Sequence, residues 1–166
     1  MLRIGSILDE SVVDGTGIRL VVFFQGCGHL CKGCHNPALL NFDGGALYAE
    51  EELGDIIIGK LTRLHRGVTL SGGDPLFQAE GAARLIDYLR RRKPGLNIWL
   101  YTGFEYEKVK DCPAVRTVDV LVDGPFVEEK KDLFLPFRGS ANQRIIEMHP
   151  TLANGRIVEH KTRFAV

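Results

Sequence analysis

The chain has 166 residues, of which 45% are hydrophobic, and its 21 basic and 21 acidic side chains give a formal net charge of zero. This length predicts a single domain over residues 1–166. The balanced charge argues against a protein drawn to nucleic acid or to an anionic membrane. The N-terminus lacks the apolar segment of a signal peptide, and no apolar run approaches the length that spans a bilayer. We therefore expect a cytoplasmic protein whose thiols stay reduced.

The first strong pattern is an apolar run over residues 18–24, interrupted only by Arg19. Such a run is typical of a strand covered on both faces, as in a parallel sheet. The preceding segment, Asp14-Gly15-Thr16-Gly17, is typical of a turn.

Three cysteines follow this strand within eight residues, in the spacing C-x3-C-x2-C: Cys27, Cys31 and Cys34. The four irons of a [4Fe–4S] cluster normally take one cysteine each, so three thiolates on one loop would leave one iron open to a small molecule. This cluster is our leading interpretation of the loop.

Two other uses of the loop remain open. A Cys3His zinc site would take His29 or His35 as fourth ligand, although zinc motifs usually divide their ligands between two separated pairs. A disulfide is the second alternative, although a redox pair at Cys31 and Cys34 would not need Cys27. The fourth cysteine of the chain, remote from this loop, is expected to be a small hydrophobic residue without a role in the site.

Helical and extended patterns alternate along the rest of the chain. Apolar residues at helical spacing predict helices over 49–64 and 79–92, with a weaker signal near 105–110. Short apolar runs predict further strands over four ranges: 68–70, 97–101, 118–122 and 144–148. The dipeptide Asn154-Gly155 favours a turn and predicts a final hairpin.

This alternation predicts an α/β fold with a mostly parallel sheet and right-handed crossovers. The glycine-rich and polar segments all follow strands, and the carboxyl ends of parallel strands share one edge where ligands bind. We expect the cysteine loop to meet 71–74, 102–103 and 123–124 at that edge. A complete eightfold barrel needs about 200 residues or more, so we expect an incomplete, open-sided (β/α) barrel. An open side would admit a large substrate, such as a loop of another protein.

The segment Ser71-Gly72-Gly73-Asp74 follows a predicted strand and precedes a predicted helix. Its glycines allow a close approach of the backbone to a ligand, and Asp74 or the carbonyl groups beside it could accept hydrogen bonds from an ammonium group. A tight turn in which Asp74 caps the next helix is an equal alternative. Asp123 could likewise bind a ribose hydroxyl or belong only to a turn, and we interpret Arg138 and Arg144 as solvated surface residues.

Together these segments resemble the radical S-adenosylmethionine (SAM) superfamily, whose mark is C-x3-C-x2-C. Within it they are similar to the small glycyl-radical activases, and most to those of anaerobic ribonucleoside-triphosphate reductase. The resemblance covers most of residues 14–144 and is carried by five segments: 14–19, 25–36, 71–76, 120–126 and 137–143. The last of these is the most particular to the reductase activases.

The resemblance implies a radical SAM fold and an oxidoreductase activity. Cys27, Cys31 and Cys34 would hold a [4Fe–4S] cluster whose open iron chelates SAM. Reductive cleavage of the bound SAM would give a 5′-deoxyadenosyl radical. That radical would take a hydrogen atom from a glycine of the partner, a glycyl-radical enzyme, which the resemblance implies to be anaerobic ribonucleoside-triphosphate reductase. A low-potential donor such as flavodoxin or ferredoxin would supply the electron.

The resemblance also implies the residues that contact SAM. The methionine end would lie against Gly72, Gly73 and Asp74. The adenosine side would lie against Gly33, Cys34 and His35. Thr102 and Asp123 are further candidates for contacts to the ribose or the methionine.

Three residues depart from the superfamily pattern. Gly33 stands where an aromatic residue often precedes the third cysteine, so His35 becomes the candidate for stacking on adenine. Asp74 replaces the more usual glutamate, and Thr16 stands where activases commonly have proline. An activase of pyruvate formate-lyase or another glycyl-radical enzyme is the alternative within the enzyme class. A non-catalytic zinc- or cluster-binding module is the alternative outside it.

Overall fold

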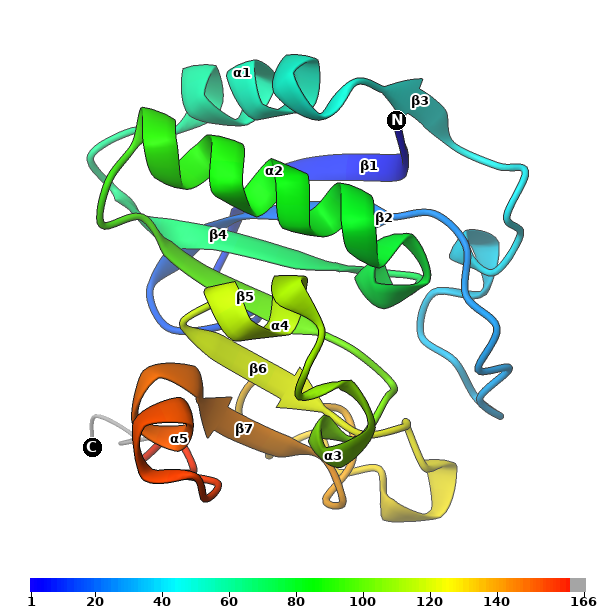
Figure 1. The fold of residues 1–166 in the computed structure, drawn as a ribbon. Helices are drawn as coiled ribbons and strands as arrows, with labels where there is room; N and C mark the ends of the chain where they lie inside the picture. The colour runs from blue at the N-terminus through cyan, green and yellow to red at the C-terminus, as the bar shows by residue number, and fades with distance from the viewer. Residues whose placement is uncertain (162–166) are drawn as a thin grey trace.

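Seven strands form one open sheet in the order β3-β1-β2-β4-β5-β6-β7 (Figure 1). The computed structural model describes residues 1–161. The strands are β1 (Leu2–Ser11), β2 (Ile18–Phe24), β3 (Ala46–Tyr48), β4 (His65–Gly72), β5 (Asn97–Tyr101), β6 (Val120–Asp123) and β7 (Arg144–Glu147). The four central strands, β2, β4, β5 and β6, are parallel, whereas β1 and β3 at one edge and β7 at the other pair antiparallel. The fold is therefore α/β with a mixed sheet that does not close.

The helices pack mainly on one face of this sheet (Figure 1). They are α1 (Glu50–Lys60), α2 (Ala79–Arg92), α3 (Tyr106–Val109), α4 (Pro113–Thr117) and α5 (Met148–Asn154), with short 3-10 turns at η1 (Pro37–Leu39), η2 (Pro75–Gln78) and η3 (Glu128–Lys130). Within the described part of the chain, no helix has the length and apolar character needed to cross a membrane.

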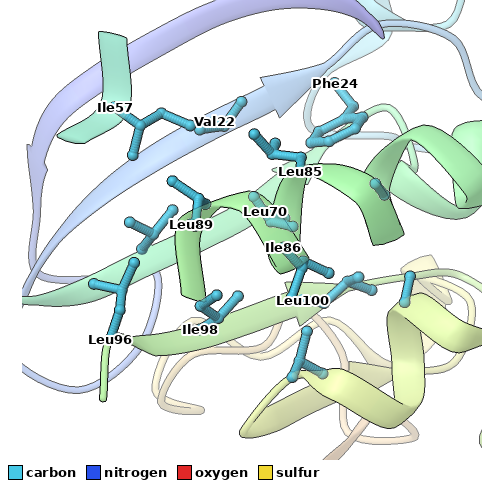
Figure 2. Packing of buried hydrophobic residues seen from close by; sticks show 14 of the residues in the cluster. Val22, Phe24, Ile57, Leu70, Leu85, Ile86, Leu89, Leu96, Ile98 and Leu100 are labelled. Atoms are coloured by element: carbon cyan, nitrogen blue, oxygen red, sulfur yellow. The ribbon is translucent and has the colours of Figure 1, made fainter. Parts of the chain in front are cut away.

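The main core lies between the sheet and α1, α2 and α4. Figure 2 shows Leu85, Ile86 and Leu89 of α2 packed over side chains of the parallel strands, among them Leu70 and Leu100. All five are fully buried, and burying an aliphatic side chain of this size contributes about 1.5–3 kcal/mol. This packing holds the strand ends, and the loops that follow them, in fixed positions.

Arg19, the one polar residue inside the first predicted strand, has its partners on the opposite face of the sheet. Arg19 is fully buried there and donates hydrogen bonds to Thr69 Oγ1 at 2.7 Å and to the Val68 carbonyl at 2.7 Å. Its guanidinium also binds Asn97 and lies 5.3 Å from the centre of the Trp99 ring. Burial lowers the pKa of Arg19 to about 10, which leaves it charged at neutral pH.

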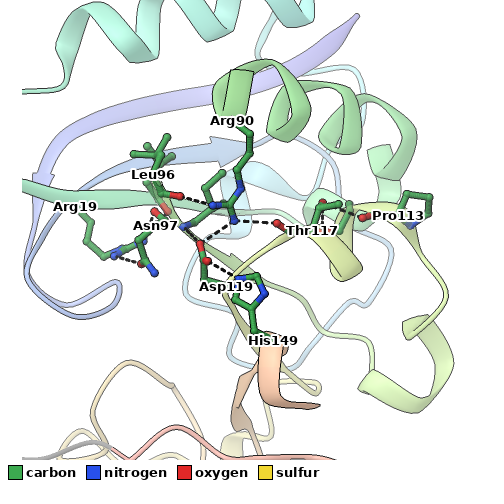
Figure 3. A network of polar contacts seen from close by, with 11 residues as sticks. Arg19, Arg90, Leu96, Asn97, Pro113, Thr117, Asp119 and His149 are labelled. Carbon is green, nitrogen blue, oxygen red and sulfur yellow. Dashed lines mark hydrogen bonds and ion pairs between the residues drawn. The ribbon is translucent and has the colours of Figure 1, made fainter. Parts of the chain in front are cut away.

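A polar network closes the amino ends of β5 and β6, at the edge opposite the cysteine loop (Figure 3). The Asp119 carboxylate accepts hydrogen bonds from Ile98 N at 2.6 Å and from Arg90 of α2 at 2.9 Å. His149 of α5 contacts the other oxygen of Asp119 at 2.9 Å. The network ties α2 and α5 to the sheet and leaves the carboxyl ends free for a site.

The central prediction, strands alternating with helices, is confirmed, and the ranges 18–24, 79–92 and 97–101 match β2, α2 and β5. The helix expected to reach residue 64 ends at Lys60, because Leu61 adopts an extended backbone. The predicted final hairpin is wrong: Gly155, at φ 65°, is the left-handed cap that ends α5. No element was predicted for β1, β3 or α4.

Candidate functional site

A cavity of about 560 Å³ opens at the carboxyl ends of the parallel strands. Its wall includes residues that follow each of the four: the cysteine loop after β2, 71–73 at the end of β4, 101–103 at the end of β5 and Gly124 after β6. The predicted convergence of four segments at one edge is thus confirmed. The volume lies within the usual range for small-molecule sites.

Cys27, Cys31 and Cys34 all line this cavity as free thiols. Cys27 is buried, at 8% exposure, and the other two are half-buried. Gly33, at φ 71°, allows the tight turn that links the second and third cysteines, in which Cys34 N donates to Cys31 O at 3.2 Å. Burial raises the pKa of the Cys27 thiol, and a bound iron would favour its thiolate instead.

Gly72 and Gly73 bring the end of β4 against the base of the cysteine loop. Gly73 N donates to Phe24 O at 2.7 Å, and a Cβ at Gly73 would lie only 2.5 Å from the Gly26 carbonyl oxygen. Gly72 has φ 110°, and a Cβ there would lie 2.4 Å from Phe24 N. Both glycines line the cavity, so they serve the close backbone packing and also form part of the wall.

Asp74 is 1% exposed, and its carboxylate is satisfied within the protein. One oxygen, Oδ1, accepts from Leu76 N at 2.8 Å and so caps η2. The other, Oδ2, lies 2.8 Å from Thr102 Oγ1, 2.9 Å from Gly103 N and 2.7 Å from His29 Nε2. The helix-cap alternative for Asp74 is therefore confirmed, and Asp74 is not among the residues that line the cavity.

Asp123 is also buried, at 1% exposure, and holds internal partners. Its carboxylate accepts from Arg144 Nε at 3.0 Å, from Arg144 Nη2 at 2.5 Å and from Tyr106 N at 2.7 Å. Arg144 also pairs with Glu107, and its hydrogen bonds to Asp123 and Glu107 raise its pKa. The interpretation of Arg144 as a solvated surface residue is wrong, because its guanidinium pairs with the buried Asp123. The local sequence showed no sign of this pair.

The other candidate SAM contacts take different positions around the cavity. Thr102 lines it and is 5% exposed. His35 also lines it, with its ring centre 6.0 Å from that of Phe126, another lining residue. Gly33 is not part of the wall, and a Cβ on it would lie 2.8 Å from Glu128 Oε1.

The sequence analysis missed one side of the cavity, formed by Tyr101, Phe126, Phe137 and Arg138. The Tyr101 hydroxyl donates to the Phe137 carbonyl at 2.8 Å, which anchors the segment 137–143. Arg138 is the one Lys or Arg side chain on the cavity wall within the described residues. The resemblance of 120–126 and 137–143 to the activases was the signal that pointed to this side.

Among the described residues, the guanidinium of Arg138 has hydrogen-bond partners for only some of its nitrogens. Its Nη1 donates to Gln143 O at 2.7 Å, whereas its buried Nε has no hydrogen-bond partner among residues 1–161. A carboxylate is the acceptor that matches the forked edge of a guanidinium. The wall therefore combines three thiols with a cation suited to a carboxylate.

Comparison with known proteins agrees with this donor set. A family model described as a 4Fe-4S single cluster domain matches residues 13–146. The anaerobic ribonucleoside-triphosphate reductase-activating protein of Vibrio cholerae is 41% identical over 141 residues, which cover 81% of this chain and 90% of that protein. The proteins of the same name from Escherichia coli K12 and Enterobacteria phage T4 are 37% and 35% identical over 80% of this chain, covering 90% and 86% of their own lengths.

The chain belongs to this family of activating proteins. All three loop cysteines and the whole β2–β6 region lie inside the range that the cluster-domain model matches. The predicted resemblance to the activases is thus confirmed, as is the expectation of an iron–sulfur cofactor. The zinc and disulfide alternatives receive no support from the family.

Proposed function

We propose that the chain is a radical SAM activase that installs a glycyl radical on anaerobic ribonucleoside-triphosphate reductase. The observation that carries this proposal is the single cavity into which the three thiols, the Gly72-Gly73 turn and the ends of β5 and β6 all converge. This arrangement provides a cluster-binding loop beside a space large enough for a nucleoside-sized ligand.

Cys27, Cys31 and Cys34 are the proposed cluster ligands. When bound, a [4Fe–4S] cluster with one open iron supplies the electron that cleaves SAM to a 5′-deoxyadenosyl radical. The protein contributes the position of the three thiols and a partly closed cavity that limits access of water. Cys27 is buried and the other two are half-buried, and all three line the cavity, so the same wall would hold the cluster and face the space for SAM.

The proposed SAM contacts follow from the chemistry of the groups that line the cavity wall and from their existing hydrogen-bond partners. The forked edge of Arg138 suits the methionine carboxylate, and backbone carbonyl groups at Gly72 and Gly73 suit the ammonium group. His35 and Phe126 present rings beside the cavity for the adenine. Thr102 lines the wall on the side proposed for the ribose, although its hydroxyl already donates to Asp74 and accepts from Phe104 N. Because the carboxylates of Asp74 and Asp123 already have internal partners, we propose that they position these groups rather than bind SAM.

The partner must place a glycine of its own chain in the same cavity. Four highly exposed apolar side chains on two loops line the cavity: Val12 at 67%, Val13 at 70%, Leu133 at 80% and Phe134 at 91% exposure. Exposed apolar groups of this kind are typical of sites that receive another protein. They support entry of a reductase segment at this side.

The open sheet would be the incomplete barrel of a radical SAM enzyme, formed by one domain over residues 1–166. Flavodoxin or ferredoxin would donate the electron, and the cytoplasm would keep the thiols reduced.

Electron paramagnetic resonance of the anaerobic chain mixed with the reductase tests the proposal. A glycyl signal should appear on the reductase only when SAM and a reductant are both present. One zinc per chain, no iron and no glycyl signal would refute the activase function.

A further inference from the structure

His29 lies between the first two cluster cysteines, and its side chain is only 18% exposed. Its Nε2 is 2.7 Å from Asp74 Oδ2. The ring also packs edge-on against two aromatic rings, with centre distances of 4.5 Å to Phe104 and 5.2 Å to Phe77. The His29 ring therefore lines the cavity wall, with its Nε2 engaged by Asp74 and its ring packed against Phe77 and Phe104.

Asp74 connects His29 to the strand ends. The oxygen that faces His29 also accepts hydrogen bonds from Thr102 and Gly103 after β5, and Asp74 N donates to Gly26 O at 3.1 Å. One buried carboxylate thus joins the cysteine loop to the carboxyl ends of both β4 and β5.

Gly103 makes room for this contact. A Cβ at Gly103 would lie 2.6 Å from Cδ2 and 2.7 Å from Nε2 of the His29 ring. The histidine consequently reaches Asp74 only because residue 103 has no side chain. This gives a way to displace His29 without altering either partner of the hydrogen bond.

The rest of the cysteine loop has weaker polar attachments. Lys32 pairs with Glu128 at 3.1 Å, but the two side chains are 81% and 42% exposed. Exposed pairs of this kind contribute little to order. Within residues 28–36, all of which the structure describes, the buried polar tie to the sheet is the one made by His29.

We propose that His29 is a positioning residue, whose hydrogen bond to Asp74 holds the cysteine loop against the ends of β4 and β5. It keeps the loop in place before a cluster arrives and sets the position of the bound cluster relative to the SAM-binding wall. The second consequence rests on the proposed function, whereas the first does not.

Three substitutions separate the hydrogen bond from the packing of the ring. His29→Phe keeps an aromatic ring between Phe77 and Phe104 but removes the donor. His29→Gln keeps an N–H donor at a similar distance from the backbone. Gly103→Ala leaves His29 and Asp74 intact and pushes the ring away. His149→Phe is the matched control, because His149 also pairs with an aspartate but is 71% exposed and lies on α5.

The first readout is amide hydrogen exchange of residues 25–36, together with alkylation of buried Cys27, in the full-length iron-free chain. Loss of a hydrogen bond to a charged group should raise the rate of loop opening about tenfold or more in His29→Phe and Gly103→Ala. His29→Gln and the control should remain close to the wild type. Wild-type protection in His29→Phe, or equal loss of protection in His29→Gln, would overturn the proposal.

The second readout is the paramagnetic spectrum of the reduced cluster with and without SAM. The change that SAM causes in this spectrum should be lost in His29→Phe and retained in His29→Gln, which general destabilisation would not produce. An unaltered SAM response in His29→Phe would overturn the positioning of the cluster. If the wild-type chain binds no iron or SAM while the exchange pattern holds, the activase proposal fails and the loop contact stands.

Discussion

Arg144 of β7 donates two hydrogen bonds, of 3.0 and 2.5 Å, to the buried carboxylate of Asp123 at the end of β6. Removing the arginine leaves the Asp123 charge buried with only the Tyr106 amide, among the described residues, to donate to it. We therefore expect Arg144→Met to lower the free energy of unfolding by about 2–3 kcal/mol, measured by urea denaturation.

Two further variants check that explanation. Adding Asp123→Asn to Arg144→Met should recover part of the loss, because the uncompensated charge is then gone. Glu107→Gln should cost less than about 1 kcal/mol, since Glu107 is 59% exposed. A SAM affinity that drops in Asp123→Asn without a loss of stability would instead support the ribose contact implied by the resemblance.

The three loop cysteines should be individually necessary. We expect Cys27→Ser, Cys31→Ser and Cys34→Ser each to lose most of the cluster iron and to abolish reductive cleavage of SAM, because each removes a proposed ligand. Iron analysis and quantification of 5′-deoxyadenosine measure the two effects. Cys112→Ser is the control, because Cys112 packs against the main core away from the loop and should keep both properties. Full activity in any of the three loop variants would contradict the assignment.

The parallel centre of the fold could be predicted because its strands are continuous apolar runs separated by amphipathic helices. β1 was not predicted, since seven of its ten residues are at least partly exposed on a strand whose place depends on pairing with β2. The end of α5 was misassigned because Asn-Gly suits both a hairpin turn and a left-handed helix cap.

The location of the site was likewise predictable, whereas its internal pairs were not. Glycine-rich segments after parallel strands must meet at one edge, so the cysteine loop and Gly72-Gly73 were placed correctly. His29 and Asp74 are 45 residues apart, and Asp123 and Arg144 are 21 apart. Partners at such distances are set by the tertiary fold, and no local pattern in a single sequence reveals them.

Gly73 should not tolerate a side chain. A Cβ there would lie 2.5 Å from Gly26 O and 2.8 Å from Leu39 O, both backbone atoms at the base of the cysteine loop. We expect Gly73→Ala to displace the loop and to weaken SAM binding by about tenfold or more, measured by anaerobic equilibrium dialysis. Gly59→Ala is the matched control, because a Cβ at Gly59 on α1 meets nothing within 4 Å. Unchanged SAM affinity in Gly73→Ala would show that this contact is not needed for the site.

Arg138 should bind its ligand through the shape of its guanidinium and not only through its charge. Lysine keeps the positive charge but has no forked edge, so Arg138→Lys is expected to raise the dissociation constant of SAM about tenfold. Anaerobic equilibrium dialysis of the cluster-loaded protein measures this change. Arg91→Lys is the control, since Arg91 lies on the exposed side of α2 and pairs only with Asp87 among the described residues. If Arg138→Lys binds SAM as the wild type does, the carboxylate of SAM lies elsewhere in the cavity, and the free edge of Arg138 does not contribute to its recognition.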